Sequence, residues 1–260
     1  MASTDSTPDF RLARAHGTVM VFSWMVFAST GVLYARYGRT VRVNKKKQIF
    51  GEDIWFQIHR FCLITTVIGT LLGFFLVLGQ AKGRWVDQAE DGDRMFAHSI
   101  LGAIVVGCAL IQAWMALFRC HPGDRFRFVF NWIHRTTGML ALILSVPTIF
   151  LVVFVLLKYH DGFVTIMSLW SAWIVIIFII FEVVEYLIRM KSSTVTANNA
   201  KAEIEHEMNN GHSASIIDGK QVEASDNSPF GTLKLILFIL NFCFAISLVI
   251  PLVALIWLQG

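Results

Sequence analysis

The sequence predicts an all-α polytopic membrane protein with six transmembrane helices. Of the 260 residues, 55% are hydrophobic and only 15% are charged, whereas soluble proteins carry roughly 25% charged residues. A helix needs about 20 residues to cross a hydrocarbon core of about 30 Å. Six apolar segments are long enough, at about residues 12–35, 54–78, 95–118, 130–157, 163–188 and 232–258.

The first apolar segment is predicted to be a transmembrane helix rather than a signal peptide. The residues ahead of it, MASTDSTPDF, are polar, and the apolar run is long enough to span a membrane. It is either the first helix of the protein or the edge of a longer natural chain. Residues 1–11 are then a short N-terminal segment, and the four segments that follow form a core over residues 12–157.

The orientation follows from the distribution of lysine and arginine. Thirteen of these residues lie in the connections after the first, third and fifth segments, against six on the opposite side. The positive-inside rule therefore predicts that the N-terminus is non-cytosolic, and an even number of spans places the C-terminus on the same side. This bias also explains the net charge of +4, so no nucleic-acid partner is expected.

The composition changes once along the chain, at residues 191–230. This stretch is polar, carries charges of both signs and has no apolar face, which predicts a flexible cytosolic loop. It separates the fifth helix, assigned to residues 158–190, from the sixth, assigned to residues 231–260.

Four histidines are the most informative residues. His16, His59, His98 and His134 lie five to ten residues inside the start of four successive apolar segments. Because neighbouring helices run in opposite directions, His16 and His98 are expected near the outer face, and His59 and His134 near the cytosolic face. An intramembrane imidazole is costly without a partner. The alternative is a structural role, in which each histidine forms a hydrogen bond between helices.

Two facing histidines are what a six-coordinate haem iron requires. The sequence therefore predicts two metal sites, with His16 and His98 as axial ligands of one haem iron and His59 and His134 as those of another. No Cys-x-x-Cys-His motif is present, so both groups would be non-covalent haem b.

Glycines and polar residues follow the histidines along the helices. Gly102 and Gly138 lie one turn deeper than His98 and His134 on the same faces, which would leave room for a macrocycle. Close helix packing is the alternative, and it is the role expected for Gly69 and Gly73. Arg94, Trp55 and Asn131 lie three or four residues before a histidine and are candidate partners of the haem propionates.

Basic residues at the two membrane surfaces are candidates for substrate attraction. On the cytosolic side these are Lys45, Lys46, Lys47, Arg60 and Arg135, which would attract an anionic donor. The alternative for Arg60 and Arg135 is contact with lipid phosphates. On the outer side they are Lys82 and Arg84, with Trp85 as a ring facing the acceptor.

The six-helix layout, the four histidines and the segments AHGTVM, WFQIHR, FAHSILG and FNWIHR resemble the transmembrane cytochrome b-561 family. The likeness covers about residues 14–190 and is to the ferric-chelate reductase branch in particular, whose members often carry an extracellular DOMON domain. The 260 residues hold no DOMON domain, and the Tyr-Arg-rich cytosolic segment that is linked to ascorbate in well-known members is absent.

The resemblance implies a transmembrane, ascorbate-dependent ferric reductase with two haem b groups, held by the histidine pairs named above. Electrons would pass from cytosolic ascorbate to an outer acceptor such as a ferric chelate or monodehydroascorbate. The membrane would be the plasma membrane or that of endosomal or secretory vesicles, and a homodimer is a candidate assembly.

Two other function classes use the same histidines. A non-enzymatic haem-binding subunit would relay electrons to a partner protein and bind no small donor. A proton or cation transporter would use the histidines as a relay and would need intramembrane acids, for which only Glu182 and Glu185 qualify. Glu185 lies four residues before Arg189, a spacing that predicts an ordinary ion pair.

Overall fold

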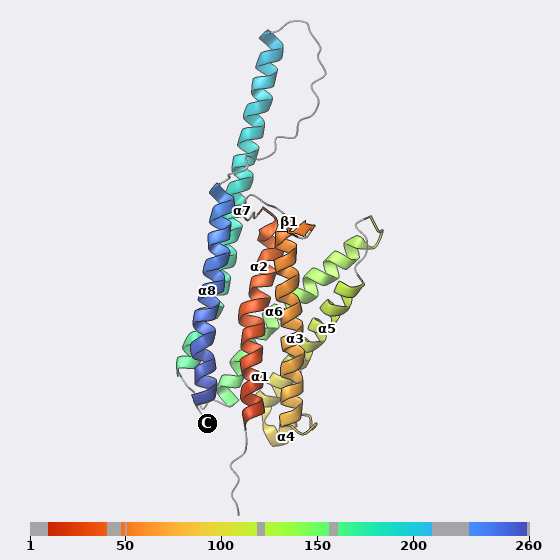
Figure 1. Ribbon diagram of the computed structural model, residues 1–260, viewed down its shortest axis with the longest axis vertical. Helices are drawn as coiled ribbons and strands as arrows, with labels where there is room; N and C mark the ends of the chain where they lie inside the picture. The colour runs from red at the N-terminus through yellow and green to blue at the C-terminus, as the bar shows by residue number, and fades with distance from the viewer. Residues whose placement is uncertain are drawn as a thin grey trace, which may run out of the picture.

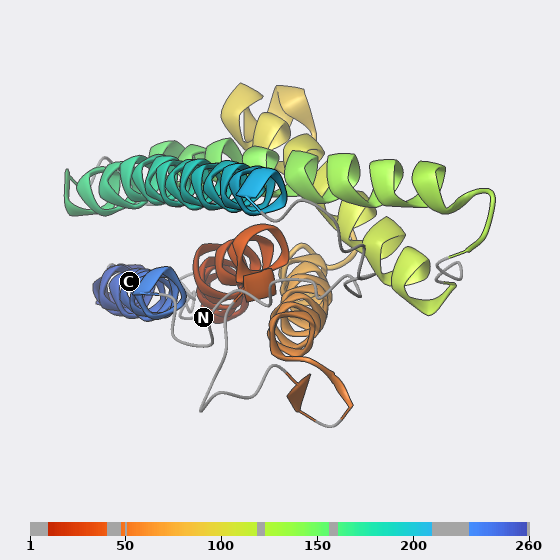
Figure 2. The same cartoon turned by 90° about the horizontal axis from the view of Figure 1, so that it is seen from above.

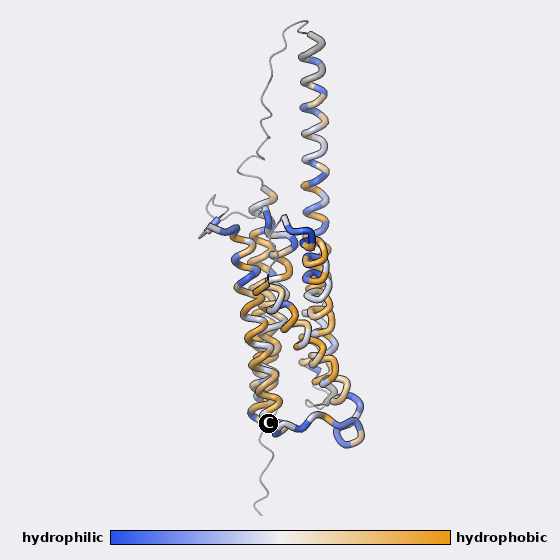
Figure 3. The backbone as a smooth tube through the Cα atoms, turned by 90° about the vertical axis from the view of Figure 1, so that its right-hand side faces the viewer, coloured by the Kyte–Doolittle hydropathy of each residue, from blue (hydrophilic) through white to orange (hydrophobic). Residues whose placement is uncertain are grey.

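The computed structural model describes residues 10–40, 48–49, 51–118, 123–155, 161–209 and 229–258. Six helices within these ranges are long and apolar enough to cross a membrane. Apolar residues line the helices along the length of the bundle, and polar residues collect at its two ends and on one helix that extends beyond it (Figure 3). The predicted all-α polytopic fold is confirmed.

The first span consists of three consecutive segments, α1 (Arg11–Val21), the π-helical η1 (Phe22–Ala28) and α2 (Ser29–Tyr37), and ends in the 3₁₀ turn η2 (Gly38–Thr40). The other spans are α3 (Ile54–Gln80), α5 (Asp93–Leu117), α6 (Arg127–Val155), α7 (Asp161–Asn209) and α8 (Pro229–Leu258). The short elements are α4 (Gln88–Asp91) and an antiparallel ribbon of β1 (Gln48–Ile49) and β2 (Glu52–Asp53), in which Gln48 pairs with Asp53.

The bundle has two ends, which we call the α4 end and the β-ribbon end (Figure 1). Helix α1 begins and α8 ends at the α4 end, whereas α2 ends and α7 extends outward at the β-ribbon end. Seen from above, α8 and α3 lie on opposite sides of the first span (Figure 2). That span is 61% buried over its most apolar window, against 22% to 33% for the others, so it forms the centre of the fold.

Glycines set how closely α3 approaches the first span. A Cβ atom at Gly69 would collide with the side chain of Ser23, and one at Gly73 would lie 2.9 Å from Met20 Cε. On the facing helix, a Cβ atom at Gly31 would collide with Leu63. The two helices therefore pack at a separation that only glycine permits. This is the role that the sequence predicted for Gly69 and Gly73.

Two ion pairs tie α7 and α8 to the end of the first span. The ammonium group of Lys234 is fully buried and donates to Glu185 Oε1 at 2.5 Å and to Thr40 Oγ1 at 2.8 Å. Arg36 pairs with Glu182, whose Oε1 also accepts a hydrogen bond from the hydroxyl of Tyr37 at 2.7 Å. Charges near the membrane require such partners.

These pairs correct one expectation. The spacing of Glu185 and Arg189 predicted an ion pair within α7, but Glu185 pairs with Lys234 of α8 instead. Side chains four residues apart on one helix compete with those of packed neighbours, and the buried lysine supplies the closer partner. Since Glu182 and Glu185, the two intramembrane acids, are engaged in ion pairs, they do not form the free relay that a transporter would need.

The predicted boundary of α7 is also wrong. Residues 191–230 were expected to form a loop, but α7 continues without a break to Asn209. At about 1.5 Å per residue, residues 191–209 extend the helix by about 28 Å. They are the helix that protrudes from the bundle in Figure 1. No apolar face is needed for this extension because it contacts solvent, and its Thr and Ser hydroxyls bond to carbonyls one turn back. Residues 210–228 lie outside the described ranges.

The buried ion pair yields a stability prediction. Replacing Lys234 by Met leaves the Glu185 carboxylate without its cation, so we expect the free energy of unfolding in detergent to fall by about 3 kcal/mol. Adding Glu185→Leu to this variant should restore most of the loss. Lys201→Met, on the exposed extension of α7, is the control and should leave the unfolding midpoint unchanged. A single Lys234→Met variant as stable as the wild type would contradict the proposed contribution of this pair.

The glycine contacts yield a second prediction. Gly69→Ala should lower the free energy of unfolding by about 1–3 kcal/mol, because the added methyl group overlaps the short side chain of Ser23. The control is Gly107→Ala on α5, where an added Cβ atom would meet nothing within 4 Å. It should be neutral or stabilise the helix by about 0.5–1 kcal/mol. Equal effects of the two substitutions would show that packing at Gly69 is not limiting.

Candidate functional site

The four helical histidines form two pairs, one toward each end of the bundle. The ring centroids of His16 and His98 lie 6.3 Å apart with their planes at 78°. Those of His59 and His134 lie 6.2 Å apart at 82°. The structure thus brings together the same pairs that the antiparallel order of the helices predicted, with nearly equal geometry in each.

Three of these rings bond to a backbone carbonyl through Nδ1. His16 bonds to the carbonyl of Gly73 at 2.7 Å, and His98 to that of Thr148 at 2.8 Å. His59 bonds to the carbonyl of Gly31 at 2.9 Å. A carbonyl oxygen can only accept, so Nδ1 carries the hydrogen in each case, and Nε2 of the neutral ring is left with its lone pair.

The tautomers decide what the His16–His98 pair can do. Both Nε2 atoms are acceptors while the rings are neutral, so the two imidazoles have no N–H group to share. The hydrogen bonding between helices that the sequence offered as the alternative is therefore present, through Nδ1 and the carbonyls of neighbouring helices, but it leaves both Nε2 atoms unused. Two neutral imidazoles with free Nε2 lone pairs and ring centroids 6.3 Å apart suit a metal ion. A carbonyl-bonded Nδ1–H is also the usual support of a ligating histidine.

The separation of the rings fits a metal between them. A metal–nitrogen bond of about 2.0 Å on each side, together with about 1.1 Å from nitrogen to ring centroid, places two opposed imidazole centroids about 6 Å apart. Both observed separations agree with this value. No cluster of three or more His, Cys, Asp or Glu ligands occurs among the described residues, and a haem iron needs only two protein ligands.

A cavity adjoins the His16–His98 pair. A Cβ atom at Gly102 would meet only Thr148 Cγ2, at 3.9 Å, so the face of α5 beside His98 is open, as expected for a bound macrocycle. Apart from the two histidines, the walls are mainly apolar, with Trp24 and two hydroxyl side chains as the polar exceptions. The cavity is lined by His16, Met20, Trp24, His98, Gly102, Val105, Val106, Ser145, Thr148 and Ile149.

Gly138 has a different neighbour from the one that the sequence suggested. A Cβ atom there would lie 3.6 Å from Gln112 Nε2, and this amide also donates to the carbonyl of His134 at 2.9 Å and to Thr137. The space beside Gly138 is therefore taken up by the contact between α5 and α6. Its proposed role in making room for haem stays a prediction, with a packing role now visible beside it.

The His59–His134 pair is covered by an aromatic stack. Phe130 lies one turn before His134 on α6, and the two rings are parallel within 11° at 6.0 Å. The guanidinium of Arg127 lies over the ring of Phe130, 5.3 Å from its centroid. This stack extends from His134 toward the β-ribbon end.

The structure places the three predicted propionate partners in different surroundings. Trp55 donates to Asp53 Oδ2 at 3.1 Å, and the guanidinium of Arg39 lies 5.5 Å from its ring. Asn131 and Arg94 are exposed on the first turns of α6 and α5. Their assignment to a haem therefore remains a prediction.

The structure describes only two of the five residues that were predicted to attract the electron donor. Arg60 donates to Gln57 Oε1 at 2.6 Å and lies 5.8 Å from the ring of Phe56, so it extends along its own helix. Arg135 is exposed beside His134. Lys45, Lys46 and Lys47 lie outside the described residues.

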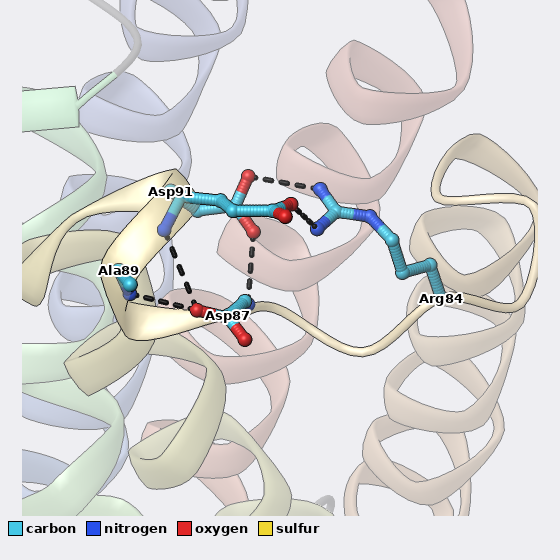
Figure 4. Close-up of polar contacts among 5 residues, drawn as sticks. Arg84, Asp87, Ala89 and Asp91 are labelled. Carbon is cyan, nitrogen blue, oxygen red and sulfur yellow. Dashed lines mark hydrogen bonds and ion pairs between the residues drawn. The ribbon is translucent and has the colours of Figure 1, made fainter.

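The loop at the α4 end is tied together by ion pairs (Figure 4). Arg84 bonds to Glu90 and Asp91, each at 2.9 Å. The carboxylate of Asp87 caps α4 by accepting from the backbone N–H of Ala89 at 2.8 Å. Trp85 is 48% exposed, which agrees with a ring that faces solvent or the membrane surface. The charge of Arg84, however, is compensated within the loop.

Ionisation in this loop follows from these contacts. The backbone N–H of Asp87 and the guanidinium of Arg84 both stabilise the carboxylate of Asp91 and lower the pKa of Asp91. Hydrogen bonding to Asp91 in turn raises the pKa of Arg84. Both groups are therefore charged throughout the physiological range.

Sequence reasoning missed several residues that shape the site. The carbonyls of Gly31, Gly73 and Thr148 carry no side-chain signal, so they could not be found from the sequence. Phe130 could have been found, because it lies four residues before His134 on one helix face. Trp24 could not, because its place at the cavity depends on how the helices pack.

Comparison with known proteins supports the resemblance in the motifs. The chain is 36% identical to human ferric-chelate reductase 1 over 140 residues, which is 54% of this chain and 22% of the relative. The mouse ferric-chelate reductase 1 matches equally well over the same share of each chain. A cytochrome b561 and DOMON domain-containing protein of Arabidopsis thaliana is 29% identical over 140 residues, 54% of this chain and 31% of the relative.

These matches confirm that the chain resembles ferric-chelate reductases and cytochrome b561 proteins. They span less than a third of the length of each of these relatives. No family model matches the chain, and no solved structure matches it.

The pKa of Asp91 yields a prediction for the loop. The folded-state pKa is lowered, so the contribution of this carboxylate is complete above its ordinary pKa and is lost as the pH falls through the lowered value. We expect the protection of the Asp87 amide from hydrogen exchange to decline between about pH 5 and about pH 2. Asp91→Asn has no titrating carboxyl group, so the protection of the Asp87 amide should not change with pH. A wild-type amide whose protection factor does not change with pH would rule out this linkage.

Proposed function

We propose that this chain carries electrons across a membrane through two haem b groups, one held by His16 and His98 and the other by His59 and His134. The observation that carries the proposal is the approach of His16 and His98, whose ring centroids lie 6.3 Å apart and whose Nδ1 atoms are bonded to the carbonyls of Gly73 and Thr148. The equal spacing of the second pair and the names of the relatives support it.

Bound by a pair of these histidines, a haem b would supply one-electron redox chemistry. The protein's part is to hold and orient the ligands. The backbone carbonyls fix the ring tautomers, and the apolar walls of the cavity keep water out.

The two sites divide the membrane crossing. His16 and Gly31, whose carbonyl holds His59, are 15 residues apart on the first span, or about 22 Å at 1.5 Å per residue. The pairs therefore lie in opposite halves of a hydrocarbon core of about 30 Å, and one long transfer becomes two shorter ones.

We further propose that the β-ribbon end faces the cytosol and the α4 end faces outward, in the plasma membrane or an endosomal or secretory vesicle membrane. The donor would be ascorbate, attracted by Lys45, Lys46, Lys47, Arg60 and Arg135. The acceptor would be a ferric chelate, as the name of the human relative suggests, or monodehydroascorbate.

A second candidate is an electron-relay subunit that serves a partner protein. The charge of the loop at the α4 end favours it. Residues 81–94 contain three basic and four acidic side chains, and Arg84 is paired with two of the acids. This loop therefore does not offer the excess of positive charge that would attract an anionic chelate. Reduction of a soluble ferric chelate by the purified chain would favour the reductase, and transfer only to a partner protein the relay.

The haem proposal predicts that substitutions in each histidine pair remove a different haem and stop electron transfer at a different end of the bundle. Wild-type protein should hold two b-type haems per chain, measured by absorption and by extraction of the pigment. His59→Ala or His134→Ala should remove one of them and block reduction from the β-ribbon end. His16→Ala or His98→Ala should remove the other and leave a haem that is reduced but does not pass its electron to the α4 end.

The control is His206→Ala, which changes a histidine outside the two pairs and should retain both haems. A folded wild-type protein without haem would refute the proposal. Loss of the same haem from variants of both pairs would refute the pairing.

A further inference from the structure

The side chain of Trp24 is a buried donor without an acceptor. Its indole is 5% exposed, and its Nε1 forms no hydrogen bond with any of the described residues. An indole N–H can only donate, and a buried donor that is left unpaired is destabilising. Such an exception in a native interior calls for an explanation at that place.

Other buried indoles show what the fold normally provides. Trp170 is fully buried in the same core, and its Nε1 donates to the carbonyl of Met25 at 3.2 Å. Trp173 donates to Asn241 Oδ1 at 3.1 Å. The core therefore supplies acceptors to its tryptophans, and Trp24 differs from these two in lining a cavity.

The place of Trp24 links it to the candidate site. It lines the cavity that also contains His16 and His98. The hydroxyls of Ser145 and Thr148 on the same walls donate to carbonyls of their own helix, those of Leu142 and Leu144. The polar lining of this cavity thus consists of two imidazoles, two self-bonded hydroxyls and one unused N–H donor.

Trp24 also lies at mid-height between the two histidine pairs. It is eight residues beyond His16 and seven before Gly31 on the first span, so it is about 10–12 Å from each level. It belongs to η1, the π-helical segment, and π-helical turns frequently occur at functional sites.

We propose that the indole N–H of Trp24 directs its dipole into this cavity, toward the macrocycle that His16 and His98 would hold, and stabilises that group's reduced state. This inference rests on the proposed function. Reduction adds one negative charge to the bound group. The positive end of an N–H dipole in a low-dielectric, water-poor site stabilises such a charge strongly. Trp24 would thereby raise the midpoint potential of the site at the α4 end above that of the other site and favour electron flow toward it.

The test is Trp24→Phe in the full chain, loaded with haem. Phenylalanine keeps an apolar ring but has no donor. We expect the midpoint potential of the site at the α4 end to fall, with the potential of the other site unchanged. The two components are assigned with His16→Ala and His59→Ala. Trp170→Phe is the matched control, since it removes a buried indole that already has an acceptor; it should lower the unfolding midpoint and leave both potentials unchanged.

Two results would overturn the inference. One is a Trp24→Phe protein in which both potentials match the wild type. The other is a fall in the potential of the site at the β-ribbon end alone. Wild-type protein that folds but holds no haem would instead overturn the proposed function, so the two failures are distinguishable.

A second measurement covers a variant that fails to fold. The wild-type protein is labelled with ¹⁵N at the nitrogens of its eight tryptophan indoles. The chemical shift of one indole resonance should change when the first electron reduces the site at the α4 end. If no indole resonance shifts, the proposed contact between Trp24 and the bound group is refuted, as it is by unchanged potentials in Trp24→Phe.

Discussion

The hydrogen bonds from His16 and His59 to backbone carbonyls depend on the close packing of α3 against the first span. Gly73 and Gly31 accept these bonds, and both are positions where a side chain would press on the facing helix. Glycine therefore does two things at once. It lets the helices approach, and it leaves its carbonyl within reach of an imidazole on the neighbouring helix. The orientation of two candidate ligands is thus a consequence of helix packing.

The rest of the bundle supports this contact from the outside. Helix α8 lies against the side of the first span opposite α3 (Figure 2), and Lys234 ties it to Glu185 of α7 and to Thr40 at the end of that span. In helix α6, Thr148 directly follows Pro147, the proline inside the helix, and proline interrupts the regular backbone ladder.

Hydrophobicity and charge were enough to predict the six spans and the pairing of the histidines, because both depend on period and direction alone. The extension of α7 was missed because a polar helix in water has no apolar face to reveal it. The partner of Glu185 was missed because the spacing on one helix says nothing about Lys234 on another. Carbonyl acceptors and the cavity position of Trp24 carry no sequence signal, since they arise only when helices pack.

The two histidine pairs have the same ligand types and nearly the same ring separation, so ligation alone gives no reason for electrons to favour one over the other. Any preference must come from the surroundings, which tune a haem through hydrogen bonds and local charge. Those surroundings differ: Phe130 stacks on His134 and the guanidinium of Arg127 lies over Phe130, whereas the indole of Trp24 lines the cavity of the other pair. Arg127 lies near the surface, where water and salt screen its charge, but the buried N–H of Trp24 is not screened. In the proposed function, the unscreened dipole of Trp24 would therefore outweigh the screened charge of Arg127, and the direction of electron transfer would be set in the apolar middle of the bundle.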